Sequence, residues 1–189
     1  AQLYREIGAR RPGLFTHVGL GTFVDPRHGG GRMNASAGDD LVEVVTIDGR
    51  DILRYKTFPV HVALIRGSFA DADGNVSLDR EAASLDTYAV AQAAHNCGGK
   101  VIVQVRSAVA RGSLPARSVH IPGAIVVGVV VDPDQAMTYD FYYDPCISGE
   151  HKAPVPKQAP QPHSIRRSIA RRAAAELRDG AIINFGYGI

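Results

Sequence analysis

The sequence has few cysteines, no tryptophan and no long apolar run, and these absences exclude several classes of protein. Its two cysteines, Cys97 and Cys146, lack C-x-x-C spacing, which favours free thiols and a reducing compartment over a disulfide scaffold. No stretch reaches the roughly 18 apolar residues of a membrane helix, and residues 1–13 lack the apolar segment of a signal peptide. We therefore expect a cytoplasmic protein with no membrane contact.

Excess charge of either sign is also scarce. Lysine and arginine number 21 against 19 aspartates and glutamates, which gives a formal net charge of +2. Arginines gather only after residue 164, on a segment whose pattern favours a solvated or subunit-facing helix: Arg166, Arg167, Arg171, Arg172 and Arg178. This balance is too weak to imply a nucleic-acid partner.

What the sequence does contain is a series of short apolar segments. Residues 60–70, 100–105 and 123–131 are typical of buried strands, and residues 60–70 are apolar on both faces, as in the central strand of a sheet. Residues 41–58 indicate two short strands joined by an Asp-Gly pair, which is a strong hairpin signal.

One helix is expected before the second of these apolar strands. Between residues 83 and 96 one face is apolar: Leu85, Ala89, Val90, Ala93 and Ala94. Ser84 is a plausible N-cap, and the Cys97-Gly98-Gly99 run supplies a glycine to end the helix. A helix followed by an apolar strand is half of a βαβ unit. The sequence therefore predicts an α/β protein with an open, largely parallel sheet and flanking helices.

A second domain is expected near the end of the chain. Residues 151–163 contain four prolines and no periodic pattern, which is typical of a linker. A helix is predicted from Ser164, with Gly180 just past its end and an apolar stripe of Ile165, Ile169, Ala173 and Leu177. The segment 181–185 then has the pattern of a strand that runs into Gly186-x-Gly188.

The same strand-to-glycine pattern occurs near the start of the chain. Residues 14–18 form an apolar strand that meets Gly19-x-Gly21, and a long polar loop follows over residues 26–40. Backbone N–H groups at such a turn can bind an anion, although a simple turn explains the glycines equally well. The pattern lacks the further glycine and the helix of a dinucleotide site. The repeat indicates two similar domains.

Other motifs give no site. The segment 71–82 begins like a calcium loop but has Val76 where glycine is needed and Ala82 where glutamate is needed, so it indicates a turn. No histidine pair has metal-ligand spacing among His17, His28, His61, His95 and His120. Residue chemistry alone predicts no metal site and no nucleophile.

Taken together, several stretches resemble the coenzyme A transferases that form a glutamyl-CoA thioester. They are "GLGTFVDPRHGGGRMN", "ADADGNVSLDREA", "AAHNCGGKVIVQV", "SVHIPG", "YDPCISGE" and "IARRAAAELRDGAIINFGYGI", and they cover nearly the whole chain. The sequence is most similar to the acetate/propionate and 3-oxoacid type, in which two halves are fused. The resemblance implies that residues 1–150 belong to the first domain, 151–163 to a linker and 164–189 to the start of the second.

The resemblance also implies a reaction and a site. Acyl-CoA and a small carboxylic acid would exchange CoA through a glutamate that lies outside this chain, with coenzyme A as substrate and no other cofactor. The acyl or carboxylate pocket would be lined by Gly19, Gly21, Thr22, Phe23 and Val24, and the CoA site by Gly186 and Gly188. Asp25 and Arg27 have two interpretations, substrate binding or an internal ion pair that holds the loop.

No catalytic residue is assigned within the chain. Glu81, Glu150 and Glu176 match no nucleophile motif, and Glu176 is most simply a helical partner of Arg172. An acyl-CoA hydrolase on the same scaffold, or a non-catalytic assembly or ligand-binding module, is the alternative. A homo-oligomer is expected because the strand at 181–185 would otherwise expose an apolar edge.

Overall fold

The protein is described here from a computed structural model, which describes residues 2–139, 141–154, 157, 159–160 and 162–184. The chain divides into two units, Ala1–Lys152 and Ala153–Ile189. None of the helices in the described part of the chain combines the length and the apolar character that crossing a bilayer requires.

The first unit contains a small antiparallel sheet with the strand order β1-β3-β2. Its strands are β1 (Gly13–Thr16), β2 (Val42–Ile47) and β3 (Arg50–Lys56). Asp48 and Gly49 join β2 to β3 with φ values of 49° and 73°, as a primed hairpin turn requires. The hairpin prediction is confirmed.

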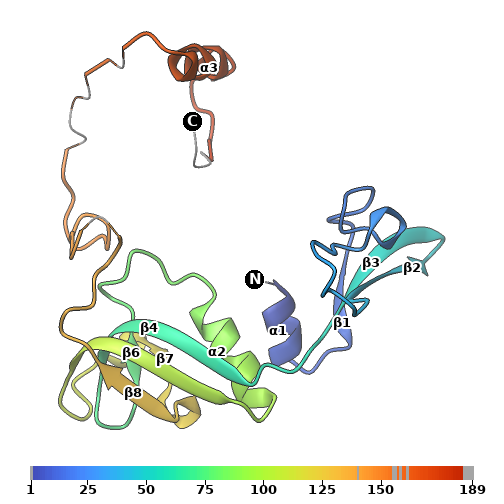
Figure 1. Ribbon diagram of the computed structural model, residues 1–189. Coiled ribbons are helices and arrows are strands. Elements are labelled where there is room, and N and C mark those ends of the chain that lie inside the picture. The colour runs from blue at the N-terminus through green and yellow to red at the C-terminus, as the bar shows by residue number, and fades with distance from the viewer. Residues whose placement is uncertain (1, 140, 155–156, 158, 161, 185–189) are drawn as a thin grey trace. The chain divides into compact units, whose positions relative to one another are not determined.

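A mixed five-stranded sheet forms the larger part of the same unit, with the strand order β7-β5-β4-β6-β8 (Figure 1). Its strands are β4 (Val62–Ala70), β5 (Val76–Ser77), β6 (Lys100–Ala108), β7 (Val119–Ile121) and β8 (Gly128–Val131). Strands β4, β6 and β8 are parallel, which confirms the α/β class, whereas β5 and β7 add antiparallel pairs that the sequence patterns did not indicate.

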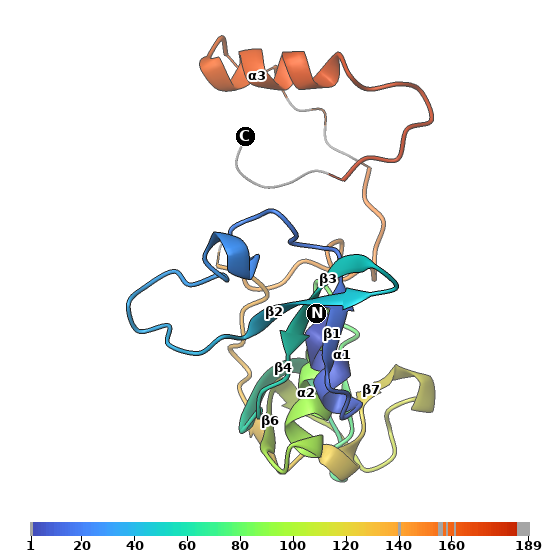
Figure 2. The ribbon, with the colours of Figure 1, turned by 90° about the vertical axis from the view of Figure 1, so that its right-hand side faces the viewer.

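Helix α2 (Thr87–Asn96) packs on this sheet against β4 and β6, and α1 (Gln2–Gly8) lies beside α2 and contacts β1 (Figures 1 and 2). The side chains of Val101, Val103 and Val105 on β6 are fully buried. Burying one valine stabilises a fold by about 1.5–3 kcal/mol. The rest of the core is formed by Ala63, Ile65, Ala70, Val76, Ala91, Ala94 and Ile121.

The start of α2 differs from the prediction. The helix begins at Thr87, with Asp86 rather than Ser84 in the N-cap position. Leu85 has a φ of 46°, a left-handed conformation that no helix interior accepts, and its side chain is 85% exposed instead of facing the core. The predicted end is confirmed, because Gly98 follows the helix with a φ of 78°.

Strand β4 is central in the sheet, as predicted, but one of its faces is exposed near the start of the strand. Ala63 and Ile65 lie in the core with α2, whereas Leu64 points the other way and is 78% exposed. A groove of about 590 Å³ runs along this strand and the segment before α2. The apolar sequence of β4 therefore did not show which face is covered.

The second unit contains one helix, α3 (Ile165–Ala174), among its described residues. The Ser164 Oγ accepts a hydrogen bond from the Arg167 N–H at 3.1 Å, so Ser164 is the N-cap, and the predicted start of the helix is confirmed. The helix ends at Ala174, before Leu177, and the part of the predicted strand at residues 181–184 has no regular structure. A strand needs a partner for its backbone groups, and the described residues of this unit supply none.

Candidate functional site

A loop rich in glycine follows β1 and leads to β2. We call residues 17–34 the glycine loop. It turns tightly three times: the Leu20 N–H donates to the His17 carbonyl at 3.2 Å, the Thr22 N–H to the Gly19 carbonyl at 3.1 Å, and the Asp25 N–H to the Thr22 carbonyl at 3.0 Å. A short 3₁₀ helix, Pro26–His28, comes next. The segment is therefore an ordered turn structure rather than a plain link between strands.

The buried carboxylate of Asp25 lies inside this loop. It accepts the Gly21 N–H at 2.9 Å and the Arg27 N–H at 3.0 Å, and the Arg27 guanidinium donates to it through Nε at 3.0 Å and Nη2 at 2.8 Å. The remaining arm of Arg27 reaches the Asp51 carboxylate on β3 at 3.0 Å. Of the two interpretations of Asp25 and Arg27, the structure shows the internal ion pair.

Charge and hydrogen bonding keep this carboxylate ionised. The hydrogen bonds from the Arg27 side chain and then from the Gly21 N–H hold the pKa of Asp25 well below its usual range. The same pairing with Asp25 raises the pKa of Arg27. The loop is thus cross-linked by a permanent ion pair at neutral pH.

The two glycines at the start of the loop serve different purposes. Gly19 has a φ of 102°, and a Cβ there would lie 2.5 Å from the Tyr55 hydroxyl oxygen and 2.5 Å from Val24. The Tyr55 hydroxyl donates to the Val18 carbonyl at 2.9 Å, and this hydrogen bond joins the loop to β3. Gly21 has a φ of 72° with open space beside it, so only its backbone conformation requires glycine.

The N–H groups of the loop are not all free for a ligand. Those of Leu20, Gly21 and Thr22 donate within the loop. The N–H groups of Phe23 and Val24 have no acceptor among the residues that the structure describes. Beside them the Phe23 side chain is 61% exposed. Two adjacent donors and an exposed aromatic ring are the features of this loop that a small carboxylate could contact.

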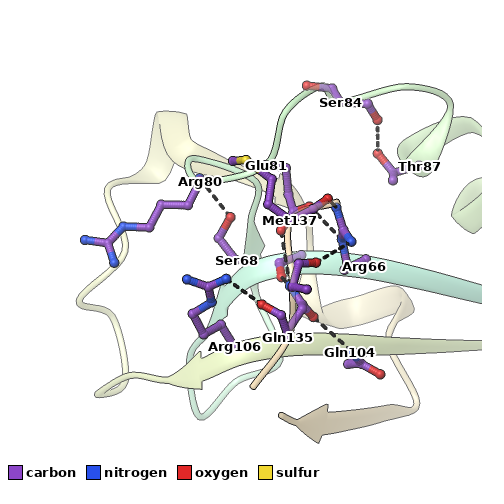
Figure 3. Close-up of polar contacts among 12 residues, drawn as sticks. Arg66, Ser68, Arg80, Glu81, Ser84, Thr87, Gln104, Arg106, Gln135 and Met137 are labelled. Carbon is purple, nitrogen blue, oxygen red and sulfur yellow. Dashed lines mark hydrogen bonds and ion pairs between the residues drawn. The ribbon is translucent and has the colours of Figure 1, made fainter. Parts of the chain in front are cut away.

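A second polar cluster, centred on Glu81, joins β4 and β6 to the segment after β8 (Figure 3). The Arg66 Nε donates to one oxygen of Glu81 at 2.7 Å, and the Gln135 side-chain amide donates to the other at 3.2 Å. The same amide nitrogen donates to the Gly67 carbonyl at 2.9 Å. The carboxylate of Glu81 is therefore occupied by internal partners, and Arg80 points away from it in Figure 3.

Further hydrogen bonds fasten the segment after β8 to the sheet. The Arg66 guanidinium donates to the carbonyls of Ala136 and Met137 at 2.9 and 3.0 Å, and the Gln104 amide donates to the Gln135 side chain at 3.1 Å. The cavity at this cluster measures about 10 Å³, which is room for one water molecule at most. The contacts of the Glu81 cluster hold the segment after β8 on the sheet. No sequence pattern indicated the cluster, because the partners of Glu81 lie 15 and 54 positions away.

The turn after β4 matches the sequence prediction. The Asp71 carboxylate accepts the N–H groups of Asp73 and Asn75, each at 3.0 Å, and the Asn75 side-chain amide at 3.1 Å. These bonds, with that of the Asn75 side chain first, lower the pKa of Asp71. Among the residues described, no group of three or more His, Cys, Asp or Glu side chains is placed to hold a metal ion.

The other residues that the sequence singled out have separate outcomes. Gly186 and Gly188, expected at the CoA site, fall outside the described residues. Glu150 accepts the Ser148 hydroxyl at 2.8 Å. Arg172 and Glu176 form the predicted helical pair, with 3.0 Å between nitrogen and oxygen.

Comparisons with known proteins agree on one family. The sequence model described as "Coenzyme A transferase" matches residues 1–132. The chain is 46% identical to the caffeate CoA-transferase of Acetobacterium woodii, over 99% of this chain and 36% of that protein. It is 39% identical to the acetate CoA-transferase YdiF of Escherichia coli K12, over 100% of this chain and 36% of that protein. The chain thus spans about a third of the length of the curated relatives it matches.

Solved structures show the same relationship. The apoenzyme of the acyl-CoA transferase YdiF from Escherichia coli O157:H7 superposes with a TM-score of 0.88 at 39% identity, over 99% of this chain and 35% of that one. The glutaconate coenzyme A-transferase of Acidaminococcus fermentans, at 18% identity and a TM-score of 0.55 over 69% of this chain and 42% of that one, shares the fold.

Proposed function

The chain belongs to the coenzyme A transferase family, and on that premise we propose that it is part of an acyl-CoA:carboxylate CoA-transferase. The observation that carries this proposal is similarity along the whole chain to two enzymes that are both named as CoA-transferases, at 46% and 39% identity. A module that kept only the fold for assembly or ligand binding does not require this degree of similarity.

The reaction that we propose proceeds in two exchanges. A glutamate outside this chain attacks the acyl-CoA carbonyl, the CoA thiolate leaves, and an acyl-glutamyl anhydride forms. The thiolate then attacks the glutamyl carbonyl and releases the first carboxylate, which leaves an enzyme thioester. The acceptor acid reverses both steps and departs as its own CoA ester. Coenzyme A is thus a substrate, and the scheme requires no other cofactor.

The glycine loop supplies the acyl or carboxylate pocket in this proposal. Gly19 and Gly21 allow the close turns, and Thr22 continues the loop with its hydroxyl held by the Gly19 carbonyl at 2.7 Å. The N–H groups of Phe23 and Val24 face the carboxylate oxygens. A carboxylate is a weak nucleophile and the transition states carry charge on oxygen, so fixed donors lower the barrier.

The acid that accepts CoA is proposed to be acetate, propionate or a 3-oxoacid. The relatives are named for caffeate, acetate and, at 28% identity, a 3-ketoacid. An acceptor panel should therefore contain all four kinds of acid. The Gly186-x-Gly188 segment is proposed to border the CoA thioester. Assembly of the full-length protein into a homo-oligomer stays a prediction, which sedimentation can test.

The decisive experiment uses the full-length protein that contains this chain. Its denatured mass is measured before and after incubation with acetyl-CoA, and transfer of CoA to isotope-labelled acetate is followed separately. A CoA-sized adduct that hydroxylamine removes, together with label in acetyl-CoA, supports the transferase. Release of CoA without an acceptor supports the hydrolase. If neither the adduct nor any turnover is observed, the result supports the non-catalytic alternative.

A further inference from the structure

We propose that Asp25 is a positioning residue for substrate recognition: it fixes the Thr22–Phe23–Val24 backbone without touching the substrate. This inference rests on the proposed function, because it assigns the glycine loop to the acyl or carboxylate pocket. It goes further by naming the group that gives the pocket its shape.

The carboxylate of Asp25 has no capacity left for a ligand. One oxygen accepts the Gly21 N–H and the Arg27 Nη2, and the other accepts the Arg27 N–H and Nε. The residue is also fully buried. Any effect of Asp25 on the reaction must therefore act through the backbone that it holds.

That backbone is the part of the loop that we assign to the substrate. The bond from the Gly21 N–H to the Asp25 side chain, and the one from the Asp25 N–H to the Thr22 carbonyl at 3.0 Å, close a ring around residues 22–24. Phe23 and Val24, which carry the two N–H groups without an internal acceptor, lie within it. The ring sets the direction of both donors.

Arg27 connects this ring to the sheet. It donates to Asp25 with Nε and Nη2 and to Asp51 on β3 with Nη1, so it links two carboxylates. The Asp51 carboxylate is partly exposed, whereas that of Asp25 is completely enclosed. Loss of Asp51 should leave the ring intact, whereas loss of the Asp25 charge should open it.

The test compares Asp25→Asn with Arg27→Lys and with a control, Asp39→Asn, in the full-length protein. Asparagine has nearly the shape of aspartate, but its NH₂ group is a donor and would face N–H donors, so the hydrogen bonds that the carboxylate oxygen at that position accepts would be lost. We expect kcat/KM for the carboxylate to fall by about 100-fold, mainly through a higher KM, because a displacement of about 1 Å at a reacting centre costs that much. Arg27→Lys should have a smaller effect in the same direction. Asp39 is exposed and outside the glycine loop, so its variant should behave as the wild type.

The kinetic pattern separates positioning from a general loss of structure. Fewer folded molecules would lower kcat and leave the KM for the carboxylate unchanged. An unchanged KM in Asp25→Asn, with wild-type transfer intact, overturns the positioning role and leaves the proposed function standing. If Asp25→Asn does not fold, an unchanged KM in Arg27→Lys overturns it in the same way. Absence of CoA transfer by the wild type overturns both proposals.

Discussion

The two sheets of the first unit are stabilised in different ways. The five-stranded sheet buries valine, isoleucine and alanine against α2. In the three-stranded sheet Leu53 is the large side chain that is fully buried, and charged residues link its parts. Hydrophobic burial has no direction, whereas hydrogen bonds and ion pairs fix angles and distances. The candidate pocket lies on the sheet whose geometry depends on directional contacts.

Ion pairs recur across the small sheet. Arg54 on β3 donates to Glu43 on β2 at 2.7 Å and to the Pro12 carbonyl, also at 2.7 Å. Lys56 approaches the other oxygen of Glu43 at 3.2 Å. The hydrogen bonds from Arg54 and then from Lys56 lower the pKa of Glu43. Ion pairs therefore join β3 to β2, and hydrogen bonds from Arg54 join β3 to the residue before β1.

The largest effect is expected where the small sheet has apolar support. Replacing Leu53 by alanine should destabilise this sheet by about 2–5 kcal/mol, because a cavity replaces its buried side chain. Hydrogen exchange followed by mass spectrometry should show loss of protection in β1, β2 and β3, while β6 keeps its protection.

The matched variant is Val103→Ala in the large sheet. Removing two methyl groups from a fully buried site should cost about 2 kcal/mol and lower protection in β4, β6 and β8. If Leu53→Ala lowered the protection from hydrogen exchange equally in both sheets, the two sheets would unfold as one cooperative unit. That result would contradict the view that they are stabilised separately.

Acid should loosen the small sheet. The folded-state pKa values of Asp25 and Glu43 lie below their unfolded values of about 4, so their stabilising effect is complete above about pH 5 and is lost as the pH falls through the folded values. The urea midpoint of the double variant Asp25→Asn with Glu43→Gln should therefore vary less between about pH 6 and pH 3 than that of the wild type.

Asp71 provides the corresponding test in the large sheet, since its pKa is lowered as well. One carboxylate should account for less of the pH dependence of stability than two. Asp71→Asn is therefore expected to reduce the variation of the urea midpoint with pH less than the double variant does. The reverse order would contradict the assignment of acid sensitivity to the small sheet.

Glycine substitutions in the loop should have a smaller effect. Gly21→Ala introduces a left-handed alanine into open space, at a cost of about 1 kcal/mol. Gly19→Ala adds a clash with Tyr55 and Val24 to the same strain and should cost more. Thermal unfolding of the two variants measures the difference in Tm. Equal decreases in Tm would show that Tyr55 and Val24 can move aside for the added methyl group at little cost.

The smallest effect is expected at an exposed ion pair. Arg172 and Glu176 on the second unit are both largely exposed, in contrast to the enclosed carboxylate of Asp25. Glu176→Gln should reduce the stability of the helix by about 0.3–0.5 kcal/mol, and added salt should remove the difference. Circular dichroism at low and high salt measures it, with Asp179→Asn as the control. A large, salt-independent loss would argue against a solvated pair.

The sequence determined the features whose causes are local. Asp48 and Gly49 specify the hairpin, Gly98 the end of α2 and Ser164 the start of α3, because each supplies a conformation or a cap that its neighbours lack. Apolar segments separated by a helix indicated the parallel pair of β4 and β6. Six motifs spread along nearly the whole chain indicated the family, which the comparisons confirmed.

Only the tertiary structure decided the features that depend on distant partners. The exposure of Leu64 follows from which face α2 covers, and the late start of α2 follows from the conformation of Leu85. Glu81 meets Arg66 and Gln135 only because β4 and the segment after β8 come together. The Asp25–Arg27 pair left two interpretations open in the sequence. Folding selected the ion pair because an enclosed carboxylate is stable only when charge and hydrogen bonds replace the water it has lost.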